Sequence, residues 1–217
     1  MGWQRALWRD RIEAGVQLAE QLSGWRNDPL AMVLGLPRGG IVVAAEVATR
    51  LQLPLHSWAV RKLAHPSNPE LALGAIAPGG VLIWEEPYEQ MDAQLRQRVV
   101  AEQQLELQRR QRLYGDPPVA SLGHRHLLVV DDGVATGLTV RAAVQSLRQA
   151  RPSQLVLAVP VIDQQVARRL RPQLDGLVAL AEVEDLWAVG AWYQRFEPVD
   201  DQQVLALLAS AQAKGSR

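Results

Sequence analysis

The chain has 217 residues, of which nearly half are apolar, enough to bury the core of one domain with a small accessory layer. Its acidic and basic residues balance to a formal net charge of zero, so no uniform positive field exists to hold a nucleic-acid backbone or an anionic membrane. Cysteine is absent, which excludes disulfides, thiolate metal sites and a cysteine nucleophile and fits a reducing cytosol.

The first residues carry charges where a signal peptide needs an apolar core, and no run of about 18 apolar residues occurs. We therefore expect a soluble, cytoplasmic protein that binds neither membrane nor nucleic acid. No linker or repeat is visible, so residues 1–217 are expected to form a single domain.

Strand and helix patterns alternate from the start of the chain. Apolar residues three and four apart predict an opening helix over 3–22, and apolar runs at 31–36 and 55–61 predict strands on either side of a helix. The prolines in 62–70 predict an irregular loop, which a hairpin around residues 78–80 follows. One long helix, mostly polar in its second half, is expected over 88–114.

The second half continues the alternation. Strands are predicted at 126–130, 155–161 and 177–182, with a helix after each of the first two and a final helix over 200–213. Near-continuous Val, Leu and Ala in the strands indicates burial on both faces. The predicted fold class is therefore α/β, a mostly parallel sheet flanked by helices.

The segment LLVVDDGVATGLT places two carboxylates, Asp131 and Asp132, directly after a buried strand, followed by a small-residue loop that opens a helix. Ligands of open α/β sheets bind at this edge, and the backbone N–H groups of such a loop can converge on a phosphate. Two adjacent carboxylates suit sugar hydroxyls or a magnesium ion held mostly through water. The alternative is a helix N-cap with incidental acids.

VVDDGVATGLT resembles the phosphoribosyl-diphosphate (PRPP) signature of type I phosphoribosyltransferases. The resemblance implies a Rossmann-like core with a small hood and a hairpin or flexible loop. It also implies that Asp131 and Asp132 contact the ribose 2′- and 3′-hydroxyls, and that the loop holds the 5′-phosphate. The loop residues concerned are Gly133, Val134, Ala135, Thr136, Gly137 and Thr139.

Two loop positions depart from the family pattern. Gly133 stands where the family usually has an apolar residue. Ala135 stands where the hypoxanthine-specific enzymes carry an aspartate proposed as general base. The binding residues are therefore expected to be intact while one familiar catalytic group is missing.

LPRGGIVVAAEVA resembles the family's first loop, which grips pyrophosphate with backbone amides. Gly39 and Gly40 expose amides at a predicted helix start, and Arg38 offers a bidentate fork for a diphosphate. The alternative is a tight turn that needs glycine, with Arg38 solvated.

Arg61 and Lys62 end a predicted strand before a proline-bearing loop, similar to the Arg-Lys pair that begins the mobile loop of orotate phosphoribosyltransferases. In that role they would stabilise the departing pyrophosphate; otherwise they are solvated. Glu70, the only acid in the loop, is a candidate base or water-mediated metal ligand.

The C-terminal segment, about 184–213, and the N-terminal helix are expected to contribute to the hood. Trp187, Trp192 and Tyr193 are candidates to stack on a flat acceptor, or else pack the hood against the core.

Across nearly its full length the chain is similar to a bacterial group of predicted phosphoribosyltransferases without an agreed acceptor, through VRKL at 60–63, NPELALGAIA and AVGAWY. The resemblance implies a glycosyltransferase of nucleotide metabolism that moves the phosphoribosyl group of PRPP, with Mg²⁺, to a nitrogenous base or amine. The alternative is a PRPP-sensing regulator without catalysis. The long helix, at about 94–112, is a candidate homodimer contact.

Overall fold

A computed structural model describes residues 6–86 and 88–215, apart from the side chains of residues 69, 70, 89, 214 and 215. In this part of the chain, five parallel strands form a central sheet in the order β2–β1–β6–β7–β8. Their bounds are β1 Ala31–Gly35, β2 Leu55–Ser57, β6 His126–Val130, β7 Gln154–Asp163 and β8 Gly176–Val183. The parallel α/β sheet predicted from the sequence is confirmed.

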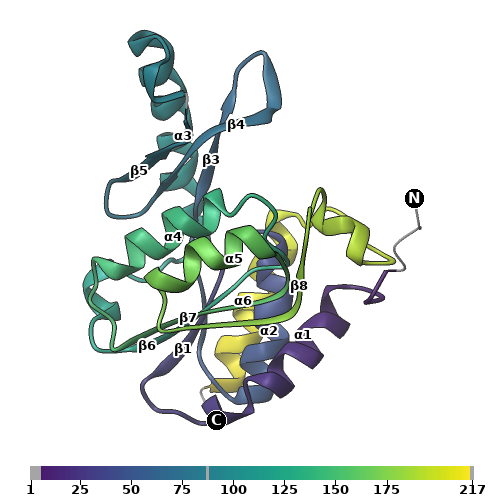
Figure 1. Cartoon of the computed structure of the whole chain (residues 1–217). Helices are drawn as coiled ribbons and strands as arrows, with labels where there is room; N and C mark the ends of the chain where they lie inside the picture. The colour runs from purple at the N-terminus through teal and green to yellow at the C-terminus, as the bar shows by residue number, and fades with distance from the viewer. Residues whose placement is uncertain (1–5, 87, 216–217) are drawn as a thin grey trace.

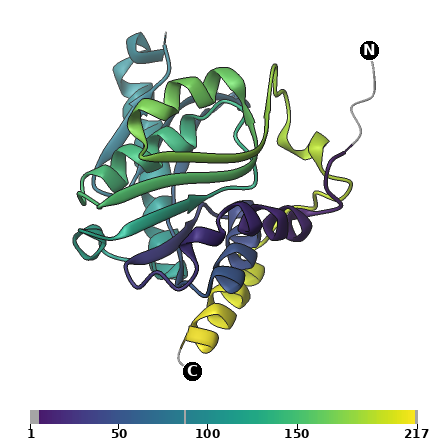
Figure 2. The same cartoon turned by 60° about the horizontal axis from the view of Figure 1, so that its bottom comes forward.

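Helices cover both faces of this sheet, as Figure 2 shows. On one face lie α1 Arg11–Gln21, α2 Gly39–Leu51 and α6 Asp201–Gly215, and on the other lie α4 Leu138–Arg148 and α5 Gln164–Leu170. Successive residues of a strand point to opposite faces of the sheet: Val33 and Leu128 pack under α2, whereas Leu34 and Val129 pack under α4. Burial on both faces explains why the strands are almost continuously apolar.

A second sheet extends from one end of the first (Figure 1). It is antiparallel and consists of β3 Arg61–His65, β4 Asn68–Ala77 and β5 Val81–Trp84, with α3 Ala93–Tyr114 packed on it. Leu63, Leu73 and Ile76 of the strands share a buried cluster with Val99 and Leu107 of α3.

The prediction of an irregular loop over 62–70 is wrong. These residues form most of β3 and the start of β4, joined by a turn at residues 66–67, with register shifts on both sides of Ala64. Pro66 lies in the turn, where its missing N–H removes no ladder hydrogen bond. The predicted strand over 55–61 is likewise too long, because β2 ends at Ser57 and Arg61 begins a strand of the other sheet.

Two helix starts also differ from expectation. α1 begins at Arg11 because Asp10 caps it, its side chain accepting a hydrogen bond from the Glu13 amide at 3.0 Å. Residues 6–10 are not helical, and the earlier part of the predicted helix lies outside the described residues. α3 begins at Ala93, capped by Asp92, after a short 3₁₀ turn at Tyr88–Gln90.

No helix among residues 6–86 and 88–215 combines the length and the apolar character needed to cross a bilayer.

Candidate functional site

Two glycine-containing loops meet where adjacent central strands end. β1 and β6 pair in parallel, so the loop into α2 and the loop into α4 leave the same edge of the sheet. An ideal Cβ on Gly40 would lie 2.8 Å from Asp131 Oδ1, and one on Gly39 would overlap Asp132 Oδ2. The close approach of the loops therefore requires glycine, and the structure brings the two candidate glycines against the two candidate acids.

The loop after β6 is anchored to β7. The Val134 N–H donates to the Val161 carbonyl at 2.9 Å, and the Asp163 N–H donates to the Val134 carbonyl at 2.9 Å. Gly137 has a φ of 76°, a left-handed conformation that favours glycine, and α4 begins at the next residue. Thr136 is exposed and Thr139 is half-buried in the first turn of α4. The loop is thus fixed at its middle, with the N–H groups of the α4 N-terminus at its end.

Gly133 departs from the family pattern for a packing reason. An ideal Cβ at this position would overlap Val189 Cγ1 and lie 3.0 Å from Val161 Cγ1. Val189 begins a 3₁₀ turn, Val189–Trp192, after the last strand. Its side chain thus occupies the space that an apolar residue at position 133 would fill.

Burial dominates the electrostatics of the acid pair. It raises the pKa of Asp131 well above its usual value, and the neighbouring Asp132 charge raises it further. Burial also raises the pKa of Asp132, while Arg11 opposes this rise. The Arg11 Nε donates to Asp132 Oδ2 at 2.7 Å, so these two residues form an ion pair.

Arg11 was not predicted as a site residue. It lies at the first position of α1 and is separated from Asp132 by 121 residues, so no local pattern in the sequence connects them. The signals that identified the loops were glycines and acids beside buried strands, and a single arginine at a helix start gives no comparable signal.

The three hood aromatics lie in two different environments. The Tyr193 hydroxyl donates to the backbone carbonyl of Asp132 at 2.6 Å, and its ring contacts Trp8 and Phe196. Burial, reinforced by the Asp132 charge, raises the pKa of Tyr193. Trp192 is buried in the same cluster, whereas Trp187 is 92% exposed. Tyr193 and Trp192 therefore pack the hood, and of the three candidates Trp187 presents its ring to solvent.

Basic residues gather on the α3 side of the first loop. Arg38 is at the N-cap of α2, and its Nη1 lies 3.8 Å from Asp201 Oδ1. Arg61 donates from Nε and Nη2 to Gln103 Oε1 at 3.0 and 2.8 Å. Burial lowers the pKa of Arg61, and the charge of Arg110 lowers it further. Lys62 is exposed at the second position of β3. Contrary to expectation, Arg61 and Lys62 thus begin a strand rather than end one.

Two further predictions concern an acid and a metal. Glu70 belongs to β4, but its side chain lies outside the described residues. Within the described part of the chain, no group of three or more His, Asp or Glu residues is arranged to hold a metal ion. The pair of Asp131 and Asp132 fits a Mg²⁺ that keeps several of its waters.

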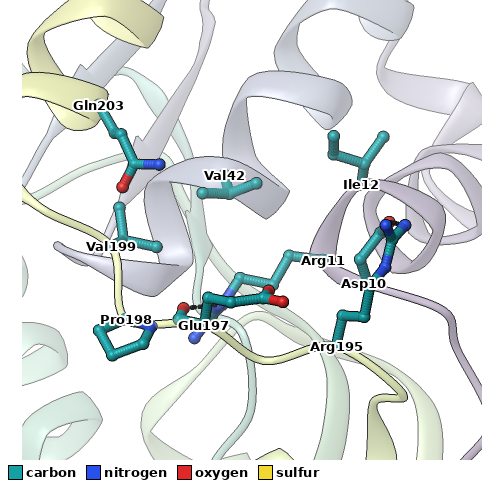
Figure 3. Close-up of a pocket in the computed structure, with 9 residues that line it drawn as sticks. All are labelled: Asp10, Arg11, Ile12, Val42, Arg195, Glu197, Pro198, Val199 and Gln203. Carbon is teal, nitrogen blue, oxygen red and sulfur yellow. Dashed lines mark hydrogen bonds and ion pairs between the residues drawn. The ribbon is translucent and has the colours of Figure 1, made fainter.

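A pocket of about 350 Å³ lies between the N-terminal ends of α1 and α2 and the segment before α6 (Figure 3). Arg11 lines this pocket, whereas Asp132 does not. The lining residues are Asp10, Arg11, Ile12, Val42, Arg195, Glu197, Pro198, Val199 and Gln203.

An open parallel sheet with helices on both faces, and with two glycine loops and an acid pair at one edge, defines a doubly wound α/β protein. The chain belongs to the phosphoribosyl transferase domain family, whose model matches residues 9–192.

Relatives agree with this assignment. The chain is 40% identical over 209 residues to proteins of two Mycobacterium tuberculosis strains, CDC 1551 / Oshkosh and H37Rv, each named "Putative phosphoribosyl transferase". The match covers 94% of this chain and 47% of those proteins, so the chain spans about half the length of the curated relatives it matches. The crystal structure of TT1426 from Thermus thermophilus is 41% identical, with a TM-score of 0.74, over 94% of this chain and 98% of that one.

Proposed function

We propose that this chain is a phosphoribosyltransferase that binds PRPP with Mg²⁺ and transfers the phosphoribosyl group to a nitrogenous acceptor. The observation that carries the proposal is the contact of Gly39 and Gly40 with Asp132 and Asp131 at the ends of adjacent strands. This arrangement joins a diphosphate loop to a sugar-binding acid pair. The whole of residues 1–217 would act as one domain, since Arg11 at one end and Tyr193 near the other both bond to Asp132.

The ribose and its 5′-phosphate would be bound by the second loop. Asp131 and Asp132 would accept hydrogen bonds from the 2′- and 3′-hydroxyls. The amides of Gly133, Ala135, Thr136 and Gly137 and the hydroxyls of Thr136 and Thr139 would donate to the phosphate. The Val134 amide, also expected from the sequence, instead donates to the Val161 carbonyl. Both acids are half-buried, which raises their pKa values. Ribose hydroxyls and Mg²⁺ would replace the solvation that this burial removes.

The pyrophosphate would be held by the first loop and the basic residues near it. Gly39 and Gly40 would offer amides, Arg38 a guanidinium, and Arg61 and Lys62 further positive charge for the leaving group. In the reaction, the bond from C1 to the pyrophosphate oxygen breaks as a bond from C1 to the acceptor nitrogen forms, with inversion. The acceptor nitrogen then loses a proton, and Mg²⁺ supplies charge neutralisation for the pyrophosphate.

Ala135 cannot take that proton, because its methyl group carries no basic atom. Glu70 is the remaining candidate base in the sequence, and the rate would come mainly from positioning and electrostatic stabilisation. Trp187 is the hood residue we assign to stacking on the acceptor, because its ring is exposed whereas Trp192 and Tyr193 are buried.

The absence of a base at position 135 also favours a second function, a PRPP-sensing protein that binds without transfer. Both functions need the same binding loops, so binding alone does not separate them. An assay of pyrophosphate release with a panel of bases and amines does: acceptor-dependent release supports the transferase, and tight PRPP binding without release supports the sensor.

Binding itself is tested by calorimetric titration of PRPP and Mg²⁺ into the wild-type protein and Asp131→Asn/Asp132→Asn. The double variant should lose affinity by at least about a hundredfold, because two charge-assisted hydrogen-bond acceptors are weakened. Asp185→Asn, an exchange of an exposed acid outside the site, is the matched control. An unchanged affinity in the double variant would remove the acid pair from the binding site.

A further inference from the structure

The guanidinium of Arg11 lies where the two glycine loops meet. Its Nε bonds to Asp132 Oδ2 at 2.7 Å and lies 3.0 Å from the position that a Cβ on Gly39 would take. Asp132 is therefore enclosed by the first loop on one side and by α1 on the other. Among the described residues, Arg11 is the cation in hydrogen-bond contact with the acid pair.

Arg11 is itself held from two further directions. Its Cζ lies 3.7 Å from the centroid of the Phe196 ring, a cation–π contact, and its Nη1 donates to the carbonyl of Glu197 at 2.9 Å. Its side chain is only 11% exposed. The Arg11 side chain is thus held by the Asp132 carboxylate, the Phe196 ring and the Glu197 carbonyl, which leaves it little conformational freedom. Asp132 Oδ2, which accepts its hydrogen bond, is held in place as well.

The backbone of Asp132 is restrained at the same time. The Tyr193 hydroxyl donates to the Asp132 carbonyl, and the Asp132 N–H donates to Asp131 Oδ1 at 2.9 Å. With the main chain held by Tyr193 and one carboxylate oxygen held by Arg11, the acid has little freedom left. Arg11 also lines the pocket beside α2, so a shorter side chain at position 11 would expose Asp132 to that pocket.

We propose that Arg11 is a positioning residue, which orients the Asp132 carboxylate so that it accepts a hydrogen bond from a ribose hydroxyl. The inference rests on the proposed function and adds a residue that lies outside both loops. It assigns Arg11 to the ribose half of the ligand, acting through Asp132. Phe196 and Glu197 are then the residues that hold Arg11.

The test measures the affinities of two ligands, each of which carries one half of PRPP. Ribose 5-phosphate has the hydroxyls that the acids would bind, and inorganic pyrophosphate with Mg²⁺ has the other half. Calorimetric titrations compare the wild-type protein with Arg11→Met, which keeps an unbranched apolar stem and removes the guanidinium with its charge. Arg9→Met is the matched control, because Arg9 is 67% exposed and pairs with Glu13.

Arg11→Met should weaken ribose 5-phosphate binding by about tenfold or more and change pyrophosphate binding by less than about twofold. Arg11→Lys, which keeps the charge, should recover part of the lost affinity. Phe196→Leu should weaken ribose 5-phosphate binding by a smaller factor, and its effect should be smaller in the Arg11→Met background than in the wild-type protein, because part of it acts through Arg11.

Unchanged ribose 5-phosphate binding in Arg11→Met overturns the inference and leaves the proposed function standing. Equal losses for both ligands also overturn it, because Arg11 would then contact pyrophosphate or support the fold as a whole. If the wild-type protein binds neither ligand, the proposed function fails, and the inference fails with it. The wild-type titrations thus separate the two failures.

Discussion

Gly133 and Val189 share one small volume between the loop after β6 and the hood. The glycine has no side chain, and Val189 Cγ1 lies 2.4 Å from the position that a Cβ would take. The glycine is therefore explained by what packs against it. The same reasoning applies to Gly39 and Gly40, whose Cβ atoms would meet the two acids.

Gly133→Ala should destabilise the protein by about 1–3 kcal/mol, because the added methyl group overpacks the contact with Val189 and Val161. Thermal or urea denaturation measures the change. Val189→Ala should restore most of the loss when combined with Gly133→Ala, giving a favourable coupling in a double-mutant cycle. Gly24→Ala, where a Cβ would meet nothing within 4 Å, is the control. Additive effects of the two exchanges would contradict this explanation.

The sequence predicts the site residues that follow buried strands and misses those that distant segments bring to the site. Asp131, Asp132, Gly39 and Gly40 follow buried strands, and the edge at which parallel strands end is a general property of the fold. Arg11 and Phe196 reach the site through contacts between distant segments, which local periodicity does not encode. The aromatic cluster was visible in the sequence, but which ring faces inward depends on the 3₁₀ turn and on Trp8.

A half-buried carboxylate, that of Asp116, connects elements of the two sheets. Asp116, just after α3, accepts hydrogen bonds from the Ala59 N–H at 2.7 Å and from the Ser57 hydroxyl. It thereby ties the end of α3 to the link between β2 and β3. Burial raises the pKa of Asp116 to about 6, and the two hydrogen bonds only partly oppose this.

The raised pKa has a definite sign for stability. The folded protein binds the Asp116 proton more tightly than the unfolded chain, whose pKa is near 3.8, so this group stabilises the fold most below pH 4. Its contribution is lost as the pH rises from about 4 to about 6.

Asp116→Asn should therefore gain stability relative to the wild-type protein over that range, by on the order of 2 kcal/mol, since the amide remains neutral. Its oxygen can accept from the Ala59 N–H while its NH₂ group donates to the Ser57 hydroxyl, which reverses that second bond. Urea denaturation of both proteins between pH 4 and 7 measures the difference. Parallel stability curves would show that the acid titrates normally.

The elements themselves differ in how well the sequence predicts them. The central strands were predicted because burial on both faces leaves long apolar runs. β3 was missed because its burial is uneven and its pairing with β4 is irregular around Ala64, so neither strict alternation nor a continuous apolar run is present. The position of Arg61 and Lys62 was misplaced for the same reason.

The molecule as a whole has four buried clusters among its described residues: two on the faces of the central sheet, one in the hood and one between α3 and the second sheet. Ala75 and Ala77 of β4 belong to the cluster that α4 covers, so the second sheet shares a core with α4. The single domain expected over residues 1–217 stays a prediction. The homodimer expected from the long helix stays a prediction.

The wild-type protein should unfold in a single calorimetric transition that PRPP with Mg²⁺ moves upward as a unit. At about 100 times its dissociation constant, the ligand adds about 2.7 kcal/mol to the free energy of unfolding, which raises the Tm by roughly 5–10 °C. Asp131→Asn/Asp132→Asn should show no rise. A second transition that the ligand leaves in place would indicate that the second sheet and α3 unfold independently.

The N-terminal segment before α1 also determines when the site can form. The Leu7 N–H donates to the Trp192 carbonyl at 3.0 Å, and the Gln194 and Arg195 N–H groups donate to the carbonyls of Trp8 and Arg9 at 2.8 Å. These partners leave the ribosome almost 190 residues apart, and domains fold as their chain emerges. During synthesis the central strands can pair while Arg11 still lacks Phe196 and Glu197. Asp131 and Asp132 would then reach their final geometry only after Phe196 and Glu197 have left the ribosome.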